Sequence, residues 1–101
     1  MGTKAERRAA RERVAAYHEA RLAELVGHVA DAVDRFRAGD VDAYHVDETI
    51  HQYHRAAREL WKFCWAGSAA QVELVTYTLD RLAEDGDAID WWQRGVPRQP
   101  R

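Results

Sequence analysis

A carboxylate and two imidazoles recur at helical spacing near the middle of this 101-residue sequence. Glu48, His51 and His54 follow one another at intervals of three residues, so their side chains lie within mutual reach on a helix. Such groups bind zinc and other divalent metals, and residues 48–51 have the E-x-x-H form used in di-iron helical bundles. Because Glu48 points away from the apolar side of the helix, this metal site would have to form between two subunits.

The same polar flank also has interpretations without a metal. Asp47 precedes His51 by four residues and His54 precedes Arg58 by four, a spacing that suits ordinary pairing on a solvated helix surface. Histidine, with an ordinary pKa of about 6.5, also makes the flank a candidate for a pH-sensitive interface. We expect a solvated surface with no bound cofactor, and a divalent metal is the alternative.

Arg13 and His18 form a second candidate pair, with the spacing R-x4-H. Arg11 with His18, and Arg21 with His28, have the spacing R-x6-H. These Arg-His spacings are similar to the motif of the HEPN helical ribonucleases, in which such a pair acts on RNA at a dimer interface. The resemblance covers this motif alone, and it implies Arg13 and His18 as the catalytic residues of an alternative, enzymatic function.

Cys64 is the single cysteine of the chain, so it cannot form an internal disulfide. His18 falls on the apolar side of the first predicted helix, and an antiparallel pairing brings it near Cys64 and Trp65. A cysteine beside a histidine can form an activated thiolate. No third orienting group accompanies the pair, and a lone cysteine in an apolar stripe usually serves as a small apolar residue. We therefore expect His18 to be partly buried with its hydrogen bonds satisfied.

Charge is distributed unevenly along the chain. Residues 1–13 contain five basic and two acidic residues, the last eight contain three arginines, and the net charge is −2. The body between the two ends must then carry a net charge of −8. A body so acidic does not favour a continuous surface that binds nucleic acid. The basic residues at 4–13 could neutralise phosphates without reading a sequence. Nucleic-acid binding is the less favoured use of these residues, and the basic ends could instead pair with the acidic body of a neighbouring subunit.

Apolar residues recur every three or four positions in three parts of the chain, which predicts amphipathic helices. The three stripes consist of Leu22, Val26, Val29, Val33 and Phe36; of Val46, Ile50, Tyr53, Ala57, Leu60 and Cys64; and of Val72, Val75, Leu79 and Leu82. They predict an all-α fold: an antiparallel three-helix bundle, made of a long helical hairpin and a third helix, with a short C-terminal helix. The seven-residue period favours coiled-coil-like packing at shallow angles.

Capping and breaking residues predict the boundaries of these helices. Thr3 with Glu6 forms a capping box before a first helix that ends at Gly39. Asp40 or Asp42 caps a second helix that extends to residue 67. So short a link requires an antiparallel hairpin.

The third helix and the C-terminal turns follow the same rules. Ser68 with Gln71 predicts a second capping box, and the third helix stops near Gly86. Asp87 is the predicted cap of one or two further turns that Gly95 closes. Residues 1–95 then form one domain with a frayed or projecting start at 1–13, and residues 96–101 form a flexible basic tail.

Four tryptophans are more than a small bundle usually buries by itself, and they favour a shared surface. We therefore expect a non-enzymatic helical module for protein–protein interaction, a homodimer with a possible further protein partner. Tryptophan and arginine most often anchor interfaces, and the expected interface residues are Trp61, Trp65, Trp91, Trp92, His54 and Arg58. No apolar run approaches the length of a membrane span, so we expect a cytoplasmic protein without a membrane partner.

Overall fold

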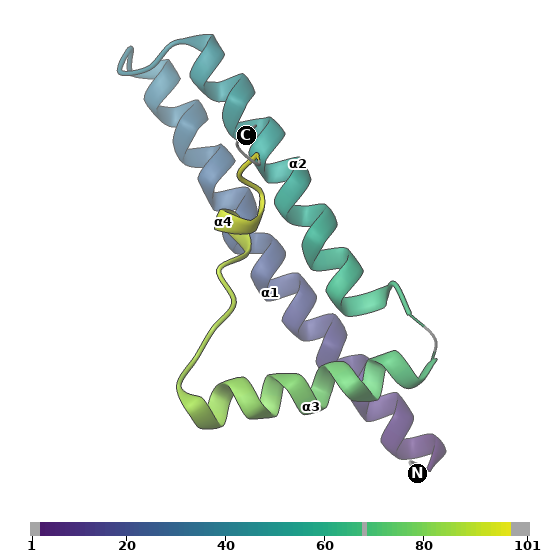
Figure 1. Cartoon of the computed structure of the whole chain (residues 1–101). Helices are drawn as coiled ribbons and strands as arrows, with labels where there is room; N and C mark the ends of the chain where they lie inside the picture. Colours follow the sequence, from purple (N-terminus) through teal and green to yellow (C-terminus); the bar gives the residue numbers. More distant parts are fainter. Residues whose placement is uncertain (1–2, 68, 98–101) are drawn as a thin grey trace.

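The computed structural model describes residues 3–67 and 69–97, and these residues form four helices without a strand (Figure 1). Helix α1 spans Lys4–Arg37, α2 spans Ala43–Trp65, α3 spans Ala69–Asp85 and α4 spans Trp91–Arg94. The predicted all-α fold, with three long helices packed together and a short C-terminal helix, is confirmed. Ser68 of the predicted capping box, and residues 98–101 of the tail predicted at 96–101, lie outside the described residues.

The local signals at the start of the hairpin act as predicted. The Thr3 hydroxyl accepts a hydrogen bond from the backbone N–H of Glu6 (3.1 Å), and the Glu6 carboxylate accepts one from the N–H of Thr3 (3.4 Å). Gly39 ends α1 with a φ of +83°, a conformation that glycine adopts without a side-chain clash. Asp42 then caps α2, where its carboxylate accepts a hydrogen bond from the N–H of His45 (3.0 Å). The link is therefore short enough to set α1 and α2 antiparallel, as Figure 1 shows.

Helix α1 is longer than α2, so its first part extends past the end of α2. Figure 1 shows α3 crossing this part of α1 at a steep angle, near the open end of the hairpin. The prediction of shallow packing is therefore wrong for α3. The physical reason is that α3 covers an apolar residue of α1 that α2 does not reach. Val14 lies on the extending part of α1 and is fully buried, and Val75 and Leu79 of α3 belong to the same core cluster.

The core contains only part of each predicted apolar stripe. Its buried members are Val14, Leu25, Ala56, Leu60, Cys64, Val75, Leu79 and Trp91. The burial predicted for Leu60, Cys64, Val75 and Leu79 is confirmed. Three other stripe residues are half exposed instead: Val26 (49%), Phe36 (47%) and Ile50 (45%). Helix α4 covers one face of the hairpin, and these three residues are not part of the face that it covers.

The segment between α3 and α4 differs from the prediction. Asp87 does not cap a helix, because its N–H is bonded to the carbonyl oxygen of Leu82 (2.8 Å) and so completes the last turn of α3. Gly86 supplies the left-handed conformation of that turn, with a φ of +71°. The cap of α4 is Asp90, whose carboxylate accepts a hydrogen bond from the N–H of Gln93 (3.1 Å). The chain between these points is extended and returns α4 to the middle of the hairpin (Figure 1).

Candidate functional site

The polar flank of α2 has the geometry of a solvated surface within one chain. The predicted pair is present, with His51 Nε2 3.4 Å from Asp47 Oδ2 and both side chains well exposed. Glu48, His54 and Arg58 are exposed as well. Across residues 3–67 and 69–97, no three His, Cys, Asp or Glu side chains gather in a way that could hold a metal ion. The alternative metal site therefore still requires ligands from a second chain.

The structure turns Arg13 and His18 toward different helices. Arg13 Nη1 lies 2.7 Å from Asp80 Oδ1 on α3. His18 Nδ1 accepts a hydrogen bond from the indole N–H of Trp65 on α2 (2.9 Å). One chain does not bring the two side chains together, so a ribonuclease site of the HEPN kind would have to be completed by a second chain.

Cys64 is fully buried in the core, and its burial raises the pKa of the thiol from 9.0 to about 11. A thiol with this pKa stays protonated at neutral pH and is a weak nucleophile. The predicted couple of Cys64 and His18 therefore does not form an activated thiolate, and Nδ1 of His18 bonds to the indole of Trp65 instead. Cys64 acts as a small apolar residue that fills the space between α1 and α2.

The two C-terminal tryptophans fold back onto the hairpin. Trp91 is 4% exposed, its indole N–H donates to the hydroxyl of Tyr17 (2.8 Å), and its ring lies 5.2 Å from that of Phe63. Trp92 stacks on His28 with the ring centres 4.0 Å apart and the planes 5° from parallel. Trp91 and Trp92 thus contribute to packing within the chain, and Trp61, at 52% exposed, is the most open of the four tryptophans.

Two polar side chains of α2 hold the backbone around α4. The amide of Gln52 donates to the carbonyl oxygen of Trp92 (3.0 Å), and Arg55 Nε donates to that of Gly95 (2.6 Å). Gly95 is buried against α2, where a Cβ would overlap the carbonyl oxygen of Gln52. These residues were not predicted as functional. Their one sequence signal, a polar pair three residues apart beside the apolar stripe, also occurs on ordinary helix surfaces.

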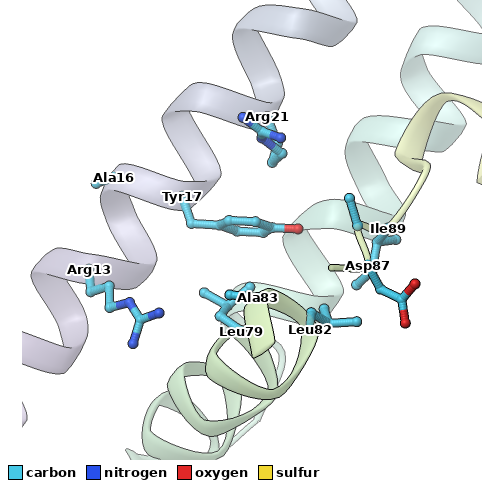
Figure 2. A pocket seen from close by; sticks show the side chains of 10 residues that line it. Arg13, Ala16, Tyr17, Arg21, Leu79, Leu82, Ala83, Asp87 and Ile89 are labelled. Atoms are coloured by element: carbon cyan, nitrogen blue, oxygen red, sulfur yellow. The ribbon is translucent and has the colours of Figure 1, made fainter. Parts of the chain in front are cut away.

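A hollow of about 470 Å³ lies between α1, α3 and the segment that leads to α4. Figure 2 shows the ring of Tyr17 lying across it, above Leu79 and Ala83. Arg21 lies over the same ring at 5.7 Å, and burial raises the pKa of the Tyr17 hydroxyl. The lining residues include no histidine, cysteine or serine. The hollow can hold an apolar group beside the polar groups of Tyr17, Arg21 and Asp87.

The side of the hairpin opposite α4 exposes large apolar side chains. Three residues of the hairpin contact the α4 tryptophans: His28, Gln52 and Phe63. The residue two positions before each of them is exposed, and these exposed residues are Val26, Ile50 and Trp61. Because two residues turn an α-helix by about 200°, the exposed members point away from α4.

Phe36 joins Ile50 on this side, since both line a hollow of about 220 Å³ near the tip of the hairpin. We call Val26, Phe36, Ile50 and Trp61 the open face.

The fold and this surface define the class of the protein as an all-α helical bundle with an exposed apolar face. Comparison of the chain with family models, with curated proteins and with solved structures found no match. Within the described part of the chain, no helix combines the length and the apolar character that crossing a membrane requires.

Proposed function

We propose that this protein is a non-enzymatic helical interaction module that forms a homodimer through the open face. One observation carries the proposal: Val26, Phe36, Ile50 and Trp61 are each about half exposed, although they lie on the apolar stripes or at their edge. Exposed apolar side chains gathered on one surface mark interaction sites more often than isolated ones do. The apolar stripes are wider than the contact between α1 and α2 requires. The apolar residues outside that contact lie on the side of the hairpin opposite α4.

A second copy of this chain is the occupant that the open face suits best. Two antiparallel hairpins that pack face to face form a four-helix bundle, and apolar residues at intervals of three and four are the pattern that such packing uses. The four side chains of the open face are uncharged, so the surface meets its own copy without like-charge repulsion. Asp47, the charged residue beside the apolar hollow, lies 3.4 Å from His51 along the same helix.

The mass of the protein in solution tests this proposal. Light scattering during gel filtration should give twice the 11.6 kDa of one chain at micromolar concentration. Val26→Asp and Ile50→Asp each place a carboxylate in the apolar contact, and we expect each to weaken association by about 100-fold or more. Circular dichroism checks that both variants keep their helices.

Tyr44→Asp is the matched control, because Tyr44 is 80% exposed and lies about 120° around α2 from Ile50. This variant should remain a dimer. A wild-type protein that is monomeric at 100 μM would contradict the proposal, and so would equal weakening by the control and the two test variants. Trp61→Ala should weaken the dimer as well, since a tryptophan in an apolar contact is a common energetic anchor.

A further inference from the structure

A groove between α2 and the segment around α4 gathers cationic side chains. It measures about 380 Å³, and its cations are Arg55, Arg58, Lys62 and Arg94. Glu59 is the one carboxylate among its lining residues, so the groove carries a formal charge of +3 in a chain whose net charge is −2. We propose that this groove binds the polyphosphate group of a small ligand, such as inorganic pyrophosphate or a nucleoside triphosphate. The proposal does not depend on the homodimer.

The spacing of the residues places the cations on one wall. Arg55, Arg58 and Lys62 follow one another at intervals of three and four residues, so they form one row along α2. Arg94 comes from α4 and Val96 from the segment after it, and they line the opposite side. The groove therefore exists because α4 returns to the hairpin, and the basic row of α2 alone would be an ordinary solvated surface.

Two of the guanidinium groups are held in place before any ligand arrives. Arg55 donates through Nε to the carbonyl oxygen of Gly95 (2.6 Å), which leaves its terminal NH₂ groups for other contacts. The guanidinium carbon of Arg94 lies 5.0 Å from the centre of the Trp91 ring. Groups held in this way lose less conformational freedom on binding, which favours affinity.

The positive charge of the groove is not neutralised within the described residues. Lys62 Nζ lies 3.3 Å from Glu59 Oε2, and this pair engages the one carboxylate of the groove. Among the ion pairs of residues 3–67 and 69–97, none includes Arg58 or Arg94. Neighbouring cations without counter-charges repel one another, and an anion that binds between them relieves this repulsion.

Phosphate is the anion that this arrangement recognises best. Guanidinium groups form paired hydrogen bonds with phosphate oxygens, and such charge-assisted bonds are about twice as strong as neutral ones. A ligand with two or three phosphates offers more negative charge and more oxygens to the four cations of the groove than a single phosphate does. A long nucleic acid is less suitable, because most of the chain outside the groove and the two basic ends is acidic.

Titration calorimetry at low ionic strength tests the proposal. We expect pyrophosphate and tripolyphosphate to bind at least about tenfold more tightly than sulfate. Arg58→Gln and Arg94→Gln should each weaken pyrophosphate binding by about tenfold, because each removes a charged donor. Arg8→Gln removes the same charge from an exposed position on α1, outside the groove, and should leave the affinity within about twofold.

The same titrations can overturn the proposal in three ways. Pyrophosphate at millimolar concentration could produce no heat and no shift in the melting temperature of the full chain. Arg8→Gln could weaken binding as much as Arg58→Gln, which would indicate general attraction by positive charge. A short single-stranded oligonucleotide could bind more tightly than tripolyphosphate, which would replace the small ligand with a nucleic acid.

Discussion

The indole N–H of Trp65 donates a hydrogen bond to Nδ1 of His18 across 2.9 Å, and this bond joins the C-terminal end of α2 to α1. The indole N–H can only donate, so Nδ1 of the imidazole is the acceptor of this bond. The two rings are 6.3 Å apart and tilted by 58°. This contact agrees with the antiparallel register of the hairpin and gives His18 a structural role within the chain.

A double-mutant cycle on this pair tests that role. Trp65→Phe leaves Nδ1 of a partly buried histidine without its donor, and His18→Leu leaves the indole N–H without its acceptor, so we expect each to lower the free energy of unfolding by about 1–3 kcal/mol. The double variant removes both polar groups, and its loss should be smaller than the sum of the single losses by about 1 kcal/mol. Urea unfolding measures all four proteins. Additive losses would show that the hydrogen bond contributes nothing.

The position of this bond could be predicted from the sequence, because it follows from the antiparallel pairing of two periodic stripes. Once a short link joins two helices, each residue of one helix lies at a defined height along the other, and His18 is therefore expected near Trp65. The angle of α3 could not be obtained in this way. It depends on how far α1 extends past α2, and on the need to cover Val14 there.

Stability should fall at alkaline pH because of Cys64. Burial raises the pKa of its thiol from 9.0 to about 11, so the unfolded chain loses this proton before the folded protein does. Between these two values the folded state binds more protons, and the free energy of unfolding decreases by about 1.4 kcal/mol per pH unit. Below pH 9 this contribution is constant.

Urea unfolding between pH 7 and pH 10.5 measures this dependence, and Cys64→Ala is its control. Tyr17 also has a raised pKa and lowers stability in the same direction above pH 10, so the difference between wild type and Cys64→Ala isolates the thiol. The variant loses packing at every pH but should have a flatter curve above pH 9. Parallel curves for the two proteins would show that the thiol is not responsible.

The attachment of α3 should depend on apolar burial far more than on its ion pair. Leu79 is buried in the core cluster, and Leu79→Ala should lower the free energy of unfolding by about 2–4 kcal/mol. Asp80 pairs with Arg13 at 2.7 Å, but both side chains are about half exposed to solvent. Asp80→Asn should therefore cost less than about 1 kcal/mol, and less still in high salt. Thermal unfolding of the two variants compares these losses, and a larger loss for Asp80→Asn would contradict this account.

The position of α4 could not be predicted from the spacing of apolar residues. A helix of four residues contains no repeat, so nothing in the sequence showed whether Trp91 and Trp92 pack on the hairpin. Their location depends on the burial of Trp91 and also on single side chains, Gln52 and Arg55, that bond to backbone carbonyl oxygens forty residues away. Such long-range polar contacts have no signature in the local sequence. The open face was missed in part for a related reason, since the stripes show which residues are apolar but not which side of each stripe a neighbour covers.

Two glycine substitutions test how closely α4 approaches the hairpin. A Cβ at Gly95 would overlap the carbonyl oxygen of Gln52 and lie 2.9 Å from the Cβ of Ala56, so Gly95→Ala must displace the backbone. We expect a loss of about 1–3 kcal/mol and a red shift in fluorescence as Trp91 becomes more exposed. A Cβ at Gly27 meets nothing within 4 Å, so Gly27→Ala should stabilise α1 by up to about 1 kcal/mol. If Gly95→Ala changed neither stability nor fluorescence, α4 could not lie against α2 as closely as the structure places it.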